Sequence, residues 1–383
     1  MIPQARCMYL RSVVLPAIIL LFLCAAAHPD IRFSGSAYSE TSFIDSDGTI
    51  RYGNRTDLHL KSVSSSQGAK LVSELEIYTL YGYLAGTNEI ISYFLEDGLF
   101  YIDRLYLKFP ISRADMILGK QRIAWGSSVI YRPTDTFNRP NPLSLSGRKE
   151  GVNAIVAKLS VGDLSAIDFV IAPADVFKRI NGEVNLEHLK YGKFASRFTF
   201  NKFKADMALS YQYDGTPEDN IFGLDIKGDL GLGYHLETVF TYNRGKFDVD
   251  DIEKYWQSVL GFDYSFGGKW ILLGEYLYNG PGRSQKADLS ASEFALLDEF
   301  QYRHYLFPQI SYLYDIFLRA NVFMLWNAVD GSFVLSPGIQ YSLFQNTDLN
   351  IYSLIFFGDE TDEYGPERMG VDQVYYLKLT VKF

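Results

Sequence analysis

Cysteine is almost absent from this sequence of 383 residues, which contains two, Cys7 and Cys24. Both lie in an N-terminal stretch with a basic start, an apolar run of about a dozen residues and a run of alanines, the pattern of a secretory signal peptide. The apolar run is too short for a membrane anchor, which is the alternative interpretation. We therefore predict a signal peptide over residues 1–27 and a mature chain over residues 28–383 without disulfides, thiols or cysteine-based metal sites.

The sequence also lacks long hydrophobic runs, an excess of basic residues and catalytic motifs. After residue 27, no apolar run approaches the roughly 20 residues that a membrane-spanning helix needs. The 45 Asp and Glu residues outnumber the 36 Lys and Arg residues, and this balance argues against nucleic acid as a partner. The 5 histidines are scattered, and G-x-S-x-G, H-E-x-x-H and P-loop motifs do not occur. We therefore expect neither an enzyme nor a cofactor.

Aromatic residues and strand-like alternation are abundant, with 28 Tyr and 28 Phe. In residues 219–229, for example, Phe222 and Leu224 lie on the face opposite Asp225. Soluble β-sandwich strands usually run about 5–6 residues, whereas these segments approach or exceed the roughly 9–11 residues of a tilted membrane-spanning strand. Aromatic residues such as Trp270 and Tyr276 near the segment ends are typical of the two membrane interfaces. The pattern favours an all-β transmembrane barrel over a soluble sandwich.

The connections between these segments support an antiparallel up-and-down barrel. We predict about eighteen strands, with sixteen as the alternative, because bacterial single-chain barrels have an even number. Short connections follow the even-numbered strands and long ones follow odd-numbered strands, as expected for short periplasmic turns and long outer loops. The predicted strands span residues 31–44, 50–62, 69–84, 97–109, 114–123, 151–161, 163–172, 191–201, 203–214, 219–229, 234–244, 254–266, 268–279, 303–314, 315–327, 332–344, 347–358 and 372–383.

Some segments depart from this pattern. Residues 347–358 are apolar at both parities, and Pro337 falls where a strand needs a ladder donor. Residues 290–300 have a helical period, so we predict a short helix on an outer loop. The acidic outer loops 248–253 and 358–367 are interpreted as solvated charge. The alternative is that they bridge to lipopolysaccharide through divalent ions.

The chain ends in QVYYLKLTVKF, a sharply alternating strand whose last residue is Phe383. Only a closed barrel satisfies every backbone group in lipid, so this strand is predicted to pair with the first one and leave no edge. A terminal aromatic residue after alternating apolar positions resembles the signal by which the barrel-assembly machinery recognises its clients. This predicts an outer-membrane location in a Gram-negative bacterium, in contact with outer-membrane lipids.

Residues 124–150 form the longest connection with a distinctive composition. Pro133, Pro140 and Pro142 fall within ten residues, which predicts a rigid, non-helical loop. The stretch LGKQRIAWGSSVIYRPTDTFNRPNPLSL, followed by GRKEGVNAI, resembles a block shared by outer-membrane porin-like families. Their pattern usually has arginine where this chain has Lys120. The resemblance implies a diffusion channel for small solutes, constricted where this third outer loop folds into the barrel.

Inward-facing charges are then expected to set the selectivity of the channel. Two roles are open for the arginines of the loop. They form bidentate contacts with an anionic solute, or they hold the loop in place through ion pairs with Asp135 and with carboxylates of the barrel wall. A structural or adhesin-type barrel and an outer-membrane enzyme are the alternative functions, and a homotrimer and a monomer are both open. The predicted pore-lining and constriction residues are Lys120, Arg122, Arg132, Asp135, Arg139, Arg104, Lys108, Arg197, Arg319, Asp225, Asp263 and Glu275.

Overall fold

The structure is a computed structural model that describes residues 31–46, 48–83, 100–138, 151–173, 191–215, 218–243, 254–287 and 300–383. It contains a sheet of 18 strands, which confirms the predicted strand number, and helix α4 (Pro366–Met369). In the described part of the chain, no helix has both the length and the apolar character to cross a membrane. The strands are β1 (Ile31–Ser46), β2 (Thr49–Ser66), β3 (Ala69–Gly82), β4 (Phe100–Ile111), β5 (Ala114–Gln121), β6 (Val152–Gly162), β7 (Ser165–Ala172), β8 (Lys193–Lys202), β9 (Ala205–Asp214), β10 (Asp219–Asp229), β11 (Gly233–Asn243), β12 (Lys254–Phe266), β13 (Trp270–Asn279), β14 (His304–Leu313), β15 (Leu318–Asn327), β16 (Phe333–Phe344), β17 (Thr347–Phe357) and β18 (Gln373–Lys382).

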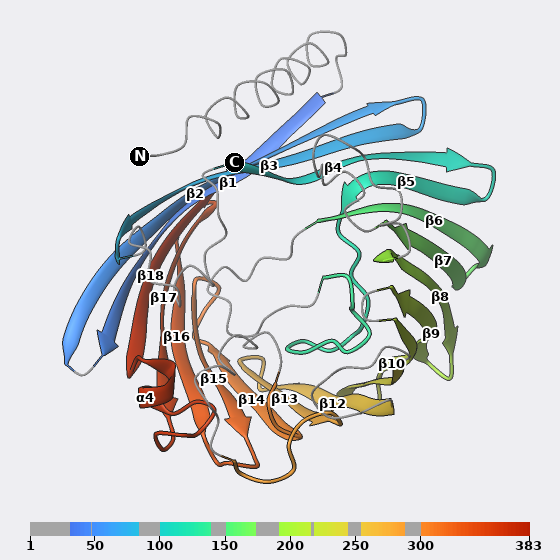
Figure 1. The fold of residues 1–383 in the computed structure, drawn as a ribbon. Helices are drawn as coiled ribbons and strands as arrows, with labels where there is room; N and C mark the ends of the chain where they lie inside the picture. Colours follow the sequence, from blue (N-terminus) through green and yellow to red (C-terminus); the bar gives the residue numbers. More distant parts are fainter. Residues whose placement is uncertain are drawn as a thin grey trace, which may run out of the picture.

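The sheet closes into a barrel (Figure 1). Each strand pairs antiparallel with its neighbours in sequence, and β1 pairs with both β2 and β18. The closing register places Phe43 opposite Tyr375 and Glu40 opposite Lys378. Beyond the last strand residue, Phe383 and Gly35 exchange two backbone hydrogen bonds of 3.0 and 2.8 Å. The first and last strands therefore leave no unpaired edge between them.

The two faces of the sheet have opposite chemistry. The exposed fraction is 51% for Phe222 and 50% for Leu209, which point outward, but 0% for Glu237 and 2% for Gln212, which point inward. A soluble protein buries apolar side chains and exposes charged ones. An apolar exterior around a polar interior is the arrangement of a barrel that spans a membrane.

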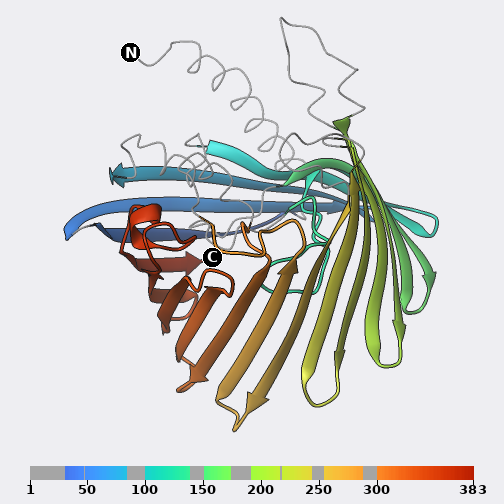
Figure 2. The same ribbon diagram turned by 60° about the horizontal axis from the view of Figure 1, so that its bottom comes forward.

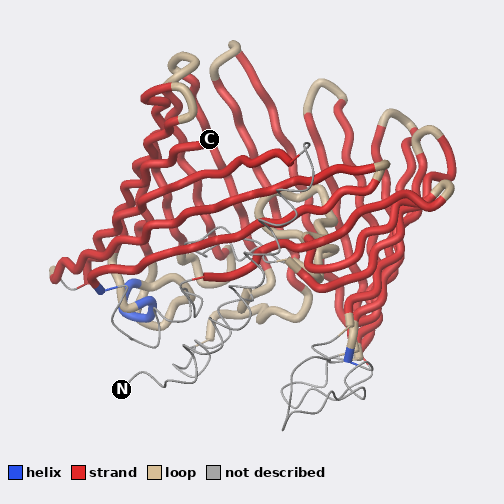
Figure 3. Tube along the Cα trace, turned by 90° about the horizontal axis from the view of Figure 1, so that it is seen from above, coloured by secondary structure: helices blue, strands red, loops and turns tan. Residues whose placement is uncertain are grey.

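The short turns that follow the even-numbered strands lie together at one end of the barrel (Figure 3). The β2–β3 turn consists of Gln67 and Gly68, and the β8–β9 turn consists of Phe203 and Lys204. All four residues have positive φ, between 47° and 85°. This backbone conformation matches the right-handed twist of the flanking strands in tight hairpins. The predicted helix at 290–300, the acidic loop 248–253 and the signal peptide lie outside the described residues, apart from Phe300.

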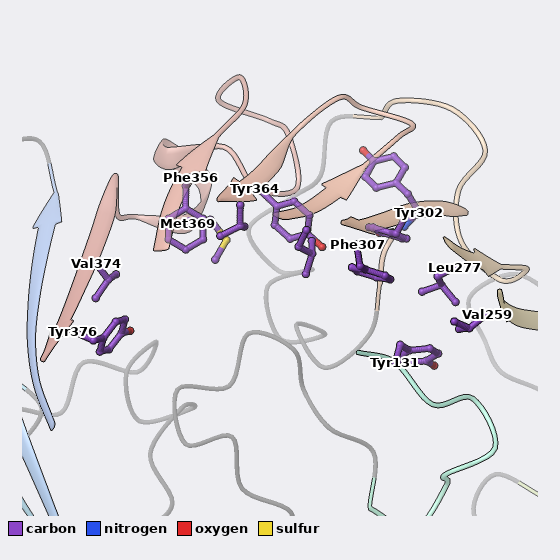
Figure 4. Close-up of a cluster of buried hydrophobic side chains, with 13 residues drawn as sticks. Tyr131, Val259, Leu277, Tyr302, Phe307, Phe356, Tyr364, Met369, Val374 and Tyr376 are labelled. Carbon is purple, nitrogen blue, oxygen red and sulfur yellow. The ribbon is translucent and has the colours of Figure 1, made fainter. Parts of the chain in front are cut away.

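The inner face is apolar along part of the wall. An aromatic-rich cluster covers the inner side of β12 to β18 and includes Tyr305, Phe307 and Phe356, with Tyr364 and Met369 from the β17–β18 connection (Figure 4). This cluster explains why β17 is apolar at both parities, because its inward residues pack in the cluster while its outward residues form the apolar exterior.

Two local differences from the predicted strands have clear causes. Pro337 lies inside β16, opposite Val322 of β15, and the pairing with β17 skips from Leu335 to Gly338. The strand continues because proline removes a single ladder donor. The second difference is that β5 ends at Gln121 rather than at residue 123, because the chain there leaves the wall and turns into the barrel.

Candidate functional site

Residues 122–138, here called the inserted segment, lie inside the ring of strands (Figures 1 and 2). Ile123 and Trp125 contact the inner face of the wall, and Phe137 packs against them. The ring centroids of Trp125 and Phe137 are 5.7 Å apart, in an edge-to-face arrangement. The segment can approach the wall closely because β6, β7 and β8 present small or medium apolar side chains there. These contacts are Ala154, Val156, Val170, Ala172 and Ala195.

Glu237 of β11 holds the middle of the inserted segment. Its carboxylate accepts backbone N–H groups from Ser127 at 3.1 Å, Ser128 at 3.1 Å and Thr134 at 2.8 Å, and the Thr134 hydroxyl at 2.6 Å. Gly126 has φ +87°, and a Cβ atom there would lie 2.5 Å from the Glu237 carboxylate. Glycine is therefore needed at this position for both the turn and the close approach.

Glu275 of β13 holds the next two residues of the segment. It accepts the backbone N–H of Val129 at 2.5 Å and of Ile130 at 2.9 Å, and His235 Nε2 lies 2.7 Å from the same carboxylate. The register places His235, Gly261 and Glu275 side by side on three neighbouring strands. A Cβ atom at Gly261 would lie 2.1 Å from the imidazole, so the glycine leaves the space in which the two side chains meet.

Further polar contacts fix both ends of the segment. Asp225 of β10 accepts the Ser127 hydroxyl, and Arg197 Nη2 lies 3.0 Å from the other oxygen of the same carboxylate. Lys193 Nζ donates to the Thr136 carbonyl at 2.9 Å. The backbone N–H of Asn138 donates to Asp135, and its side-chain oxygen accepts the N–H of Ile123 at 2.9 Å. The bond between Ile123 and Asn138 joins the beginning and the end of the segment.

The structure brings together part of the predicted residue set. Arg197, Asp225, Glu275 and the buried Asp135 meet at the inserted segment. Arg132 donates to the Ser128 carbonyl at 2.5 Å, within the segment. Other members lie elsewhere, and their role in lining a pore stays a prediction. Arg104 pairs with Glu74, Lys108 pairs with Asp115, and Lys120 lies over the Tyr101 ring. Asp263 and Arg319 are exposed, and Arg139 is outside the described residues. Arg122, the first residue of the inserted segment, is also exposed.

A second group of charges lies on the inner face of β1 to β4 and β18, and the sequence analysis missed much of it. In β2, Arg55, Asp57, His59 and Lys61 occupy alternate positions of the inward parity. This alternation is the sequence pattern from which the group could have been predicted. The ion pairs are Arg55–Asp57 at 2.5 Å, Arg55–Glu76 at 3.3 Å, Lys61–Glu74 at 2.8 Å, His59–Glu74 at 3.7 Å and Lys378–Glu40 at 3.3 Å.

One subset of this group has the spacing of a metal site. His59, Glu74 and Asp103 each offer a ligand atom, and these atoms lie within 4.8 Å of one another. However, Lys61 Nζ lies 2.8 Å from one oxygen of Glu74, and Arg104 Nε lies 3.2 Å from the other. A metal ion would have to displace two cations from the same carboxylate, so we assign no metal to these residues.

The acidic β17–β18 connection is partly buried, contrary to its interpretation as solvated charge. Asp362 forms a 2.6 Å ion pair with Lys286 of the β13–β14 connection. Glu363 accepts the Tyr305 hydroxyl at 2.7 Å and the Asn327 side-chain amide at 2.8 Å. Burial raises the pKa of Glu363 to about 7. Two outer connections are thus joined to each other and to the barrel wall.

Comparison with solved structures identifies proteins of the same fold. OccAB4 from Acinetobacter baumannii has a TM-score of 0.59 and 9% identity, over 92% of this chain and 98% of that chain. OccK11 (OpdR) from Pseudomonas aeruginosa has a TM-score of 0.58 and 12% identity, over 92% and 96%. OccD3 (OpdP) from the same organism has a TM-score of 0.55 and 8% identity, over 92% and 91%. No family model and no curated protein matches the sequence.

Proposed function

We propose that this protein is a porin of the bacterial outer membrane, a passive diffusion channel for small hydrophilic solutes or ions. One observation carries the proposal: the inserted segment is fixed by buried carboxylates inside a closed barrel of 18 strands. Barrels of about 16–18 strands are wide enough to enclose an aqueous channel. A segment held against one side of such a channel narrows the path of a solute without closing it.

Selectivity is proposed to arise from the charges that face the remaining space. Arg122 and Arg132 belong to the inserted segment, and the ion pairs of Arg55, Lys61 and Lys378 lie on the inner face of β1, β2 and β18. Charged groups that line a pore set its preference for anions or cations, and the pore width sets the size limit. Asp225, Glu237 and Glu275 contribute less in this mechanism, because their charge is directed to the inserted segment.

The proposed partners follow from the location. The apolar exterior is suited to outer-membrane lipids, and the polar ends of the barrel would contact lipopolysaccharide. Phe383, at the end of the closing strand, is proposed as the recognition signal for the barrel-assembly machinery. The transported partners are small solutes, which pass through without chemical change.

The test measures conductance and places the inserted segment in the conducting path. Purified protein in a planar lipid bilayer is expected to give discrete conductance steps. In a Val129→Cys variant, a charged thiol reagent should then reduce each step, because the side chain at 129 is 47% exposed within the barrel interior. The mature chain is predicted to have no other cysteine.

The matched control is Thr238→Cys, which places a thiol on the outer face of β11. The reagent should leave the conductance of this variant unchanged. Protein that inserts into the bilayer without conducting would overturn the porin proposal. Conductance that responds equally to modification at both positions would instead show that the inserted segment does not line the path.

A further inference from the structure

Phe300 and Gln301 are consecutive residues of the β13–β14 connection, but they contact different parts of the barrel. The Phe300 ring packs edge-to-face against the Tyr131 ring of the inserted segment, with the ring centroids 5.2 Å apart. The backbone N–H of Gln301 donates to the Glu363 carboxyl group of the β17–β18 connection at 3.1 Å. These two residues therefore link the inserted segment to the β17–β18 connection.

Both contacts of this link are shielded from water, because Tyr131 and Glu363 are buried. The Phe300 ring also packs on the Tyr305 ring, with the centroids 4.5 Å apart. The Tyr305 hydroxyl donates to Glu363 and accepts the backbone N–H of Tyr302, both at 2.7 Å. The position of this part of the β13–β14 connection therefore depends on the same carboxyl group that docks the β17–β18 connection.

Glu363 is surrounded by groups from several elements. The described titratable or charged groups that face it are Tyr302, Tyr305, Asp330, Tyr364 and Arg368. Tyrosine ordinarily titrates near pH 10 and arginine above about pH 12, so neither type changes its charge between about pH 5 and pH 8. Glu363 differs from them, because burial raises its pKa to about 7, and the Asp330 charge adds to this rise.

We propose that docking of the β17–β18 connection controls the mobility of the inserted segment, so that the constriction loosens when Glu363 ionises. The inference rests on the proposed function, since it assigns a regulation to that channel. An ionised Glu363 lies in a buried site beside the Asp330 carboxylate, which accepts its N–H at 2.8 Å, and this disfavours the docked conformation. Undocking removes the acceptor of the Gln301 N–H, and Phe300 then no longer holds Tyr131.

The inserted segment remains inside the barrel when the β17–β18 connection undocks, because its anchors on β11 and β13 do not involve that connection. Glu237 and Glu275 still accept its backbone N–H groups on either side of Tyr131. Tyr131 itself is held by the Phe300 ring and by a 3.2 Å hydrogen bond from Gln257. Loss of the Phe300 contact therefore loosens this part of the segment without detaching it, which predicts a noisier open channel.

The first test compares the open-channel noise in planar bilayers across the same pH range. In the wild-type protein the noise should rise with pH, with a midpoint near pH 7. Glu363→Gln cannot ionise and should give low noise throughout, whereas Glu360→Gln, at an exposed position of the same connection, should respond as the wild type does. His235 and Glu275 face the inserted segment in every variant. A response that survives in Glu363→Gln would therefore arise from such groups and would overturn the proposal.

A second pair of variants separates docking from its effect on the inserted segment. Phe300→Ala removes the ring that covers Tyr131 but leaves the Gln301 N–H in place. Proteolysis of residues 359–371 should still depend on pH in this variant, whereas the noise should be high throughout the pH range. Phe317→Ala removes an exposed ring from the β14–β15 turn and should behave as the wild type does. A Phe300→Ala channel whose noise still follows the pH would contradict the link.

A spin label at Val129→Cys, two residues from Tyr131, keeps this inference separate from the channel function. Its mobility reports on the inserted segment whether or not the protein conducts. The label should move more freely above the midpoint than below it, and the difference should vanish when Glu363→Gln is added. A protein that shows this difference but does not conduct would contradict only the proposed function. A conducting protein with the same label mobility at both pH values would contradict only the regulation.

Discussion

At the scale of single residues, two carboxylates determine where the inserted segment lies. Glu237 and Glu275 accept five backbone N–H groups of the segment between them. Hydrogen bonds to an ionised acceptor are roughly twice as strong as neutral ones. The backbone groups in turn would be unsatisfied in the barrel interior without these acceptors. Gly126 and Gly261 provide the space that this close approach needs.

Glu237→Gln is expected to release the middle of the inserted segment. The side-chain NH2 group would replace one of the two carboxylate oxygens and would face either the N–H groups of Ser127 and Ser128 or that of Thr134, so donors would oppose donors. Each hydrogen bond to a charged group is worth about 1.5–3 kcal/mol. We expect larger and noisier conductance steps from the variant in a planar bilayer.

The matched control for this prediction is Asp263→Asn, which also removes one inward negative charge but lies at an exposed position of β12. It should change ion selectivity slightly and leave the noise of the open channel as it is. If both variants behave alike, Glu237 acts through its charge alone and does not position the segment.

At the scale of structural elements, the β17–β18 connection is docked by a buried acid. Glu363 lies among the Tyr305 hydroxyl, the Asn327 amide and the Gln301 backbone N–H, and its own N–H donates to Asp330 at 2.8 Å. Burial raises its pKa to about 7, and Asp330 also raises it, while Arg368 and the hydrogen bonds oppose this shift. The docked conformation of this connection therefore favours the protonated, neutral form of Glu363.

Docking of this connection is expected to weaken as the pH rises. A group whose pKa is raised by docking contributes stability below its ordinary pKa of 4.5 and loses it as the pH passes about 7. The rise in the pKa of Glu363 corresponds to a loss of about 3 kcal/mol in the free energy of docking once the pH is above this raised pKa. Limited proteolysis of residues 359–371 should be slow near pH 5 and faster near pH 8.

Two variants check this assignment. Glu363→Gln should remove the pH dependence of cleavage, since an amide does not titrate. Glu360→Gln, at an exposed position three residues earlier, should retain it. A wild-type loop that is cleaved equally at both pH values, after correction for protease activity, would contradict the prediction.

At the scale of the whole molecule, closure of the barrel depends on the chain ends meeting. β1 and β18 pair over ten residues, from Ser36–Lys382 to Asp45–Gln373. Phe383 extends this pairing through its two backbone hydrogen bonds to Gly35. A Cβ atom at Gly35 would lie 2.8 Å from the Phe383 ring, so the ring covers the glycine directly. The terminal residue thus has a structural role in addition to its proposed role in assembly.

Deletion of Phe383 should impair insertion more than it alters the conductance of any channel that forms. The inserted segment is held by β10, β11 and β13, which take no part in this contact, so the constriction itself should be unchanged. The fraction of folded protein in the membrane and the single-channel conductance are the two measurements. Phe344→Ala, which removes another exposed ring near the same end, is the control and should fold normally. Normal insertion of the deletion would contradict both proposed roles.

Much of the fold was predictable because strand alternation is a local property. Side chains that alternate with a period of two identify each strand and its inward face without knowledge of its partners. The arginine contacts proposed for the loop were less successful as a guide, because Arg132 donates to the Ser128 carbonyl of its own segment. Five of the segment's contacts to the wall are made by backbone N–H groups, and every residue except proline carries one. No sequence pattern marks which of them will bind a carboxylate.

The sequence by itself determined an antiparallel barrel of about eighteen strands and its two opposite faces, since the alternation follows from neighbouring residues along the chain, and the structure fixed the number at eighteen rather than sixteen. Only the tertiary structure decided which inward carboxylates hold the inserted segment. Those contacts join residues that are 103 to 146 positions apart, such as Thr134 with Glu237 and Val129 with Glu275. Barrel closure brings such distant residues to one place, and their pairing depends on strand register and on the space left by glycine.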